Sequence, residues 1–72
     1  MDIRVRLGRR IKQVRIDMDM SQKDLAYEAD LDRSYVASVE NGKRNISIVN
    51  IEKIAKALGV SIRILFRDGD FD

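Results

Sequence analysis

Apolar residues recur along this chain at the three- and four-residue spacing of helices, without the sustained alternation that marks strands. Leu7, Ile11 and Val14 form one such stripe, which predicts a first helix from about Asp2 or Ile3 to Asp17. Similar stripes recur to the end of the chain, and proline is absent. The pattern therefore predicts an all-α fold of five helices.

Residues suited to helix caps mark four further helices. Ser21, with Asp24 three residues later, is typical of a capping box and starts the second helix. The third helix is expected from Arg33 to about Asn41, with Asp32 as its cap. The fourth is expected from Ile48 to Leu58, between Ser47 and Gly59. A short fifth helix should follow Ser61 and carry the apolar residues Ile62, Leu65 and Phe66. We expect Asp19 and Asp30 in left-handed conformations, which Asp tolerates better than most residues.

The length of the chain points to a single domain. Its 72 residues suffice for one domain, residues 1–72, and the last five, DGDFD, are expected to be a frayed acidic tail, residues 68–72. No apolar run approaches the roughly 20 residues needed to cross a bilayer. The basic N-terminus also lacks the apolar stretch of a secretory signal. We therefore expect a cytoplasmic protein without a membrane partner.

The composition argues against several kinds of chemistry. The chain has no cysteine and no histidine, which removes disulfides, thiolate zinc sites and the commonest general base. Its four glycines are too scattered for a phosphate-binding loop. The carboxylates suggest no paired acid–base arrangement. We expect no enzymatic activity, no metal and no cofactor.

Charge is distributed unevenly along the chain. The net charge is only +2, yet the first fifteen residues hold six basic side chains against one acid, and the last five hold three acids. A surface polarised in this way attracts a polyanion, although a solvated helix face fits the charges equally well. The small net charge argues against nonspecific nucleoid binding, which depends on phosphate neutralisation.

The segment from residue 21 to 42 is the most informative part of the sequence. It predicts two short helices joined by a tight turn, an arrangement that can place its second helix in the major groove of DNA. The outward face of that helix would carry the base-reading side chains Arg33, Ser34, Ala37 and Ser38, with Tyr35 to one side. Arg33 can bind guanine O6 and N7 with two donors. Ordinary surface residues are the alternative, and the preceding capped helix and turn favour base reading.

Phosphate contacts are expected on both sides of this helix. Ser21 and Gln22 lie at the N-terminus of the second helix, where backbone N–H groups favour an anion. Lys43, Arg44 and Asn45 form a basic loop that would flank the groove and set affinity and register. The alternatives are a capping-turn glutamine without a partner and a loop of solvated charge.

Two charged residues have an expected structural role. Arg15 follows Ile11 by four residues and lies at the edge of the buried stripe, while Glu40 follows the inward-facing Val39. We predict that Arg15 and Glu40 pair, partly buried, and join the first helix to the third. Two unrelated surface charges are the alternative.

At these residues the chain resembles the lambda-repressor-like helix-turn-helix family, which includes Cro, phage repressors and XRE regulators. The resemblance rests on LGRRIKQVR, MSQKDLA, LDRSYVASVENGKRN and IEKIAKALGVS, and covers roughly residues 7–66. It implies a compact five-helix domain, with DNA contacts at Gln22, Arg33, Ser34 and Ser38 and a structural salt bridge between Arg15 and Glu40. The sequence departs from the family pattern at Asp19 and Asp30, where glycine is common.

Within that family, LDRSYVASVE and KRNISIVNIEKIAKALGVS are most similar to controller proteins of restriction–modification systems. Those are bacterial dimers that activate or repress their own operon and that of the endonuclease. The resemblance implies operator DNA as partner, with RNA polymerase as a further candidate. A phage-type repressor or an antitoxin-like regulator, whose main partner is another protein, remains the alternative.

Surplus apolar residues near the fourth and fifth helices predict a homodimer. One recognition helix makes few base contacts, whereas two related by a twofold axis read paired half-sites. The expected interface residues are Ile46, Val49, Ile62, Leu65 and Phe66. Leu65 and Phe66 could equally complete the core.

Overall fold

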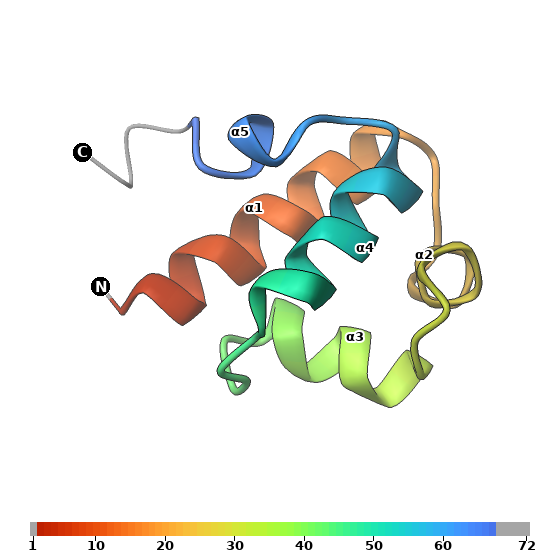
Figure 1. Cartoon of the computed structure of the whole chain (residues 1–72). Coiled ribbons are helices and arrows are strands. Elements are labelled where there is room, and N and C mark those ends of the chain that lie inside the picture. Colours follow the sequence, from red (N-terminus) through yellow and green to blue (C-terminus); the bar gives the residue numbers. More distant parts are fainter. Residues whose placement is uncertain (1, 68–72) are drawn as a thin grey trace.

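The computed structural model describes residues 2–67, which form five helices and no strand. The helices are α1 (Ile3–Asp17), α2 (Gln22–Ala29), α3 (Arg33–Glu40), α4 (Ile48–Leu58) and α5 (Ile62–Leu65) (Figure 1). The predicted all-α fold is confirmed, with boundaries within a residue of those expected. The expected acidic tail, residues 68–72, lies outside the described residues.

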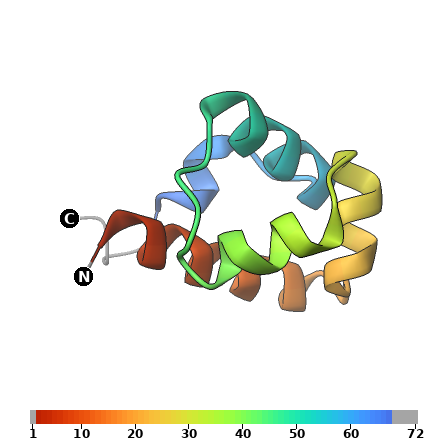
Figure 2. The same cartoon turned by 90° about the horizontal axis from the view of Figure 1, so that it is seen from below.

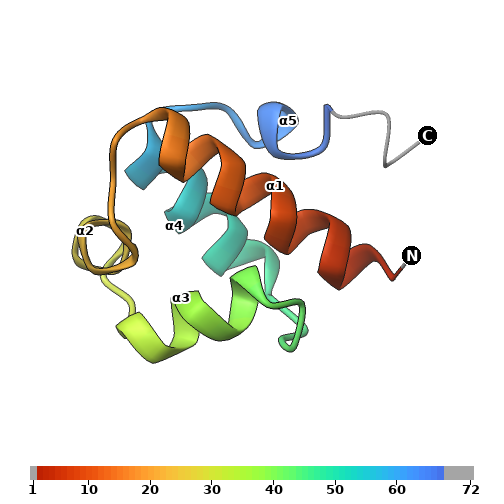
Figure 3. The ribbon, with the colours of Figure 1, turned by 180° about the vertical axis from the view of Figure 1, so that it is seen from behind.

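The helices enclose one core. Figure 2 shows α1 and α4 on opposite sides of the molecule, with α2, α3 and α5 between them. Viewed from behind, α3 and α5 lie at opposite edges of α1, and α2 is seen end-on, steeply crossed with α3 (Figure 3). The largest fully buried side chains come one from each helix and are Ile11, Leu25, Val36, Ile54 and Leu65. No single pair of helices buries this core, so all five are needed to form it.

The burial of Leu65 corrects one sequence-based expectation. Leu65 was expected at a dimer interface, but it is 0% exposed within the monomer. It is a core residue because α5 packs against both α1 and α4. A side chain without exposed surface cannot contact a second subunit.

Side-chain caps start three of the helices. Ser21 and Asp24 form the predicted capping box, with Ser21 N–H donating to the Asp24 carboxylate at 2.9 Å and Asp24 N–H to the Ser21 hydroxyl at 3.0 Å. The bond that the Asp24 carboxylate accepts from the Ser21 backbone, together with its interaction with the Ser21 side chain, holds the pKa of Asp24 below its ordinary value. Ser47 accepts from Asn50 N–H, as expected. Asp2 caps α1, and its bonds to the side chain and backbone of Arg4 lower its pKa to about 2.

Asp32 departs from the expected capping pattern. It occupies the N-cap position of α3, but its side chain makes no capping hydrogen bond. The carboxylate stays exposed, where it can still interact favourably with the positive end of the helix. The N-cap position of Asp32 was therefore predicted correctly, but its side chain does not make the capping hydrogen bond.

Left-handed residues lie in the turns that follow α1, α2 and α4. Asp19 and Asp30 have φ of 58° and 57°, as predicted, so aspartate takes the backbone conformation for which glycine is usually required. Gly59 ends α4 with φ of 72°. These turns fix the directions of α2 and of the chain after α4.

Gly8 lies where α1 and α3 touch backbone to backbone. A Cβ atom added at Gly8 would clash with the carbonyl oxygen of Val39 and lie 2.8 Å from that of Glu40. Both oxygens belong to the last turn of α3 and cannot rotate away. Glycine is therefore required by packing, although the backbone of Gly8 is ordinary helix.

We predict that Gly8→Ala destabilises the protein, although alanine is the better helix former by about 1 kcal/mol. The methyl group would force α1 away from α3, an overpacking cost of about 1–3 kcal/mol. Urea unfolding followed by circular dichroism measures the difference. Gln13→Ala, on the exposed side of α1, is the matched control and should stay within about 0.5 kcal/mol of wild type. Stabilisation by Gly8→Ala would contradict the close packing.

Candidate nucleic-acid interface

The turn between α2 and α3 sets the geometry of the candidate site. Asp30, in the left-handed conformation, ends α2, and Leu31 N–H donates back to the Ala26 carbonyl at 2.9 Å. Leu31 packs partly buried against the core. These local bonds hold α3 across α2, so α3 presents one face outward along its whole length.

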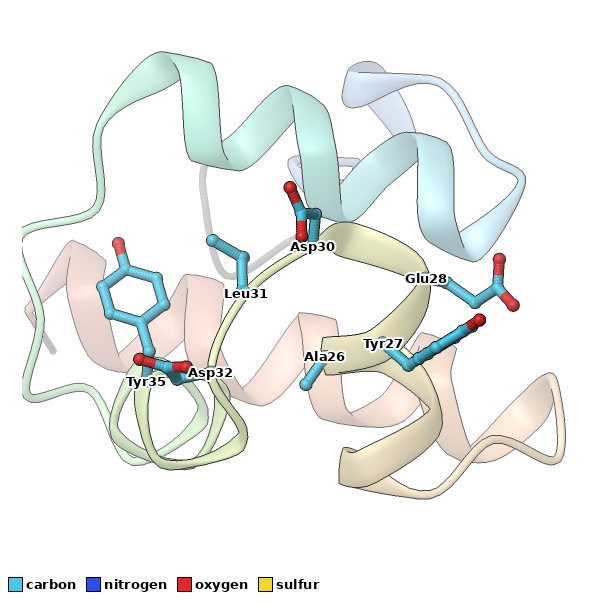
Figure 4. Close-up of a pocket in the computed structure, with 7 residues that line it drawn as sticks. All are labelled: Ala26, Tyr27, Glu28, Asp30, Leu31, Asp32 and Tyr35. Atoms are coloured by element: carbon cyan, nitrogen blue, oxygen red, sulfur yellow. The ribbon is translucent and has the colours of Figure 1, made fainter.

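The hollow beside this turn is acidic. Figure 4 shows it between the carboxyl half of α2 and the start of α3. Its lining residues are Ala26, Tyr27, Glu28, Asp30, Leu31, Asp32 and Tyr35. Three carboxylates and no basic side chain line it, so it does not suit a phosphate group.

The outward face of α3 carries the expected polar side chains. Arg33 and Ser34 are exposed, and Ala37 and Ser38 are half-buried, while Val36 and Val39 are buried on the opposite face. The exposed guanidinium therefore stands at the N-terminal end of the helix. A helix with this arrangement can bring Arg33 to a base edge in the major groove.

Ser38 and Arg44 interact with each other rather than standing apart. The Ser38 hydroxyl donates to the Tyr35 carbonyl at 2.9 Å and accepts from Arg44 Nε at 3.0 Å. The Arg44 guanidinium carbon lies 5.2 Å from the centre of the Tyr35 ring, a cation–π contact. Arg44, expected as a phosphate contact in a loop, thus lies along α3.

Asn50 completes this cluster from α4. Its side-chain amide donates to the Tyr35 hydroxyl at 3.0 Å. The Tyr35 ring therefore spans from α3 to the first turn of α4. No pattern in the sequence predicts this contact, because fifteen residues separate Tyr35 from Asn50; only the folded arrangement brings them together.

Arg15 and Glu40 lie together at the predicted junction of α1 and α3. Arg15 Nε and one terminal nitrogen donate to the two Glu40 oxygens at 2.7 and 3.0 Å, and the side chains are 10% and 2% exposed. The other terminal nitrogen donates to the Met20 carbonyl at 2.7 Å. Every nitrogen of the buried guanidinium thus has an acceptor, as a buried charge requires.

Gln22 also joins this buried pair. Its Nε2 donates to Glu40 Oε1 at 3.1 Å, which fixes the side chain at the N-terminus of α2. One amide hydrogen remains for another acceptor. Gln22 was expected to contact phosphate, with a glutamine lacking a partner as the alternative; in the structure it has a partner inside the protein.

The loop after α3 holds the other expected phosphate contacts. Lys43, Arg44 and Asn45 are exposed, and Lys43 N–H donates to the Ser38 carbonyl at 2.9 Å. This bond keeps the start of the loop at the carboxyl end of α3. Positive charge therefore lies at both ends of α3, with Arg33 at the other.

Apolar residues remain exposed at the start of α4. We call the α4 apolar surface the group Ile46, Ile48, Val49, Ile51, Ile62 and Phe66. Val49 is 60% exposed, whereas Ile46, Ile62 and Phe66 are half-buried against the core. Ile48, which the sequence analysis did not select, is the most exposed of the group at 76%. Exposed apolar area of this kind makes the α4 apolar surface a candidate interaction surface.

Within residues 2–67, no helix combines the length and apolar composition that a membrane crossing requires. Nor do these residues bring together three or more side chains of the kinds that hold a metal ion.

Known proteins resemble this chain closely. The pattern of the helix-turn-helix family matches residues 11–65. Control protein C.MunI of Mycoplasma sp is 48% identical over 68 residues, 93% of this chain and 92% of that protein. Control protein C.BamHI of Bacillus amyloliquefaciens is 50% identical over 60 residues, 82% of this chain and 74% of that protein. The crystal structure of the restriction-modification controller protein C.AhdI from Aeromonas hydrophila is similar with a TM-score of 0.86 and 48% identity, over 88% of this chain and 96% of that one.

We predict that breaking the buried pair costs more than replacing it. Arg15→Met leaves the Glu40 carboxylate buried without its ion partner and should lower the free energy of unfolding by about 3–5 kcal/mol. The double variant Arg15→Met/Glu40→Leu removes both charges and should lose less than Arg15→Met alone. Urea unfolding of wild type, Arg15→Met, Glu40→Leu and the double variant measures this. A double variant as unstable as the sum of its single changes would contradict a direct pair.

Proposed function

The chain belongs to the helix-turn-helix family, where it is similar to control proteins of restriction–modification systems, and we propose that it regulates transcription by sequence-specific binding of α3 to an operator. It is a DNA-binding regulator by family. The regulated genes that we propose are its own and those of a restriction–modification operon. The observation that carries the proposal is the placement of α3. The turn after the capped helix α2 holds α3 across α2, and α3 exposes Arg33 and Ser34 at its N-terminus.

Affinity would come from contacts to the DNA backbone on both sides of α3. The N-terminus of α2, with Ser21 and Gln22, can approach one phosphate. Glu40 fixes the Gln22 amide there and leaves one hydrogen for that phosphate. Lys43 and Asn45, exposed in the loop after α3, would hold the opposite strand. Such contacts set orientation and salt dependence rather than sequence choice.

A homodimer would place two copies of α3 in successive turns of the major groove. Half-sites one helical turn, about 34–36 Å, apart suit a twofold pair of such domains. We propose the α4 apolar surface as the interface, because Ile48 and Val49 are exposed there. RNA polymerase is a further proposed partner when the protein activates transcription. We assign the protein no enzymatic activity and propose that it acts in the cytoplasm, where the DNA lies.

We predict that Arg33→Ala removes sequence preference more than it removes binding. The test uses the duplex that wild-type protein selects from a randomised pool, compared with a scrambled duplex in a binding titration. Loss of a two-donor contact to guanine should cost about 1–3 kcal/mol of discrimination at one base pair. Binding to the scrambled duplex should change little. An equal loss on both duplexes would show that Arg33 contacts phosphate.

We predict that Val49→Glu converts a dimer into a monomer. A charge in the middle of an apolar interface should cost about 2 kcal/mol or more of association free energy. Sedimentation velocity of wild type and variant measures the change, and affinity for a duplex with two half-sites should fall with it. Ile16→Glu is the matched control, because Ile16 is 54% exposed on α1 and outside the proposed interface. A monomeric wild type, or dissociation by Ile16→Glu alone, would contradict the proposed interface.

A further inference from the structure

We infer that Arg10 on α1 is a positioning residue for the dimer, which holds α5 in place and thereby helps to set the spacing at which two copies of α3 read DNA. This inference rests on the proposed dimeric binding to an operator. Arg10 belongs neither to the exposed face of α3 nor to the α4 apolar surface, and no pattern in the sequence selects it.

The first step is that α5 depends on other elements for its position. It is a single turn of four residues, Ile62–Leu65, too short to be stable alone. Ser61 occupies its N-cap position, but the Ser61 side chain makes no capping hydrogen bond. Leu65 is the one fully buried side chain of α5. Apolar burial has no preferred direction, so it holds the turn against the core without fixing how the turn is rotated.

The second step is the directional contact that Arg10 makes with α5. Arg10 is half-buried, and its Nε donates to the Ile64 carbonyl at 3.0 Å. The last carbonyls of a helix have no partner within it, and the bond that the Ile64 oxygen accepts from Arg67 N–H is long, at 3.4 Å. A charged donor makes a stronger bond than a neutral one. The guanidinium is therefore the principal partner of this carbonyl and fixes the rotation of α5 relative to α1.

The third step is that α5 carries part of the proposed interface. Ile62 starts the turn and Phe66 follows it directly, with Phe66 N–H donating to the Arg63 carbonyl at 3.1 Å. Ile62 and Phe66 are half-buried members of the α4 apolar surface. Phe66 lines a shallow cleft together with Ile3, Arg4, Leu7, Asn45, Ile46 and Ile51. A rotation of α5 would move Phe66 in this cleft and change the surface that a second copy meets.

The fourth step links α5 to α3 through α1. Five positions along a helix turn the side-chain direction by about 140°, so Arg10 and Arg15 project from different flanks of α1. Figure 3 shows α5 and α3 at opposite edges of α1. Arg15 joins α1 to α3 through Glu40. Arg10 joins α1 to α5 through Ile64. Helix α1 therefore connects the helix proposed to read DNA with the turn proposed to contact the second copy.

The first experiment measures the spacing preference of the dimer. The probes are the duplex that wild-type protein selects from a randomised pool, versions with base pairs inserted or removed between its half-sites, and a duplex with a single half-site. Arg10→Met keeps an apolar stem but removes the donors. It should lower affinity for the selected duplex by about 10-fold, as expected for a hydrogen bond from a charged group, and lower it less on the altered spacings. Affinity for the single half-site should not change.

Two further variants separate the hydrogen bond from the charge. Lys12→Ala removes the same charge from an exposed position of α1 and should keep the wild-type spacing preference. Arg10→Lys keeps the charge and a donor but not the planar guanidinium, and should lie between wild type and Arg10→Met. Equal losses in Lys12→Ala and Arg10→Met would overturn the inference, because loss of positive charge would then explain both.

The second experiment asks whether Arg10 acts through the dimer. In sedimentation velocity, Arg10→Met should raise the dimer dissociation constant by about 10-fold. In the Val49→Glu background, which is expected to be monomeric, Arg10→Met should have no further effect on DNA affinity. An undiminished effect in that background would overturn the positioning role. So would an equal loss on paired and single half-sites that follows thermal stability, because Arg10 would then only stabilise the fold.

Failure of the proposed function would look different from failure of this inference. Wild-type protein would then select no sequence, or would bind as a monomer without a preferred spacing, and the role of Arg10 in the dimer would be wrong as well. A wild-type dimer with a preferred spacing that Arg10→Met leaves unchanged would overturn the inference alone.

Discussion

The buried pair of Arg15 and Glu40 is the interaction on which the proposed DNA-binding surface depends. Glu40 is the last residue of α3, and Arg15 also donates to the Met20 carbonyl just before α2. The same carboxylate holds Gln22 at the start of α2. One ion pair therefore fixes α1, the N-terminus of α2 and the carboxyl end of α3 relative to one another. Such a pair offers little net stability against apolar packing, so its contribution is chiefly to geometry.

Close contact between the helices makes this pair possible. Gly8 lets the backbone of α1 lie against the carbonyls of Val39 and Glu40. A larger residue would separate the helices and weaken the short bonds between Arg15 and Glu40. The close packing of α1 on α3 at Gly8 and the ion pair between Arg15 and Glu40 thus depend on each other. The consequence for the proposed function is that both ends of the α2–α3 unit are tied to the long α1 helix, so α3 would meet DNA as part of a rigid body.

Most of the features that sequence reasoning predicted well are local, with the pair of Arg15 and Glu40, 25 residues apart, as the exception. The Ser21–Asp24 capping box and the left-handed Asp19 and Asp30 depend on residues a few positions apart. Leu65, in contrast, was misplaced, because one apolar side chain in a four-residue helix looks alike whether it faces the core or a partner. Its position depends on how α5 packs against α1 and α4.

In the candidate site, too, the local features were predicted from the sequence and the other contacts between helices were not. Exposure of Arg33 and Ser34 followed from helical periodicity and the turn before them. The course of Arg44 did not, because it depends on the Tyr35 ring and, beyond it, on Asn50 in another helix. Asn50 directly follows the exposed Val49. The first turn of α4 therefore carries both the proposed dimer contact and the anchor of Tyr35, so the spacing of two α3 helices and the reading surface of each would be fixed by the same rigid turn.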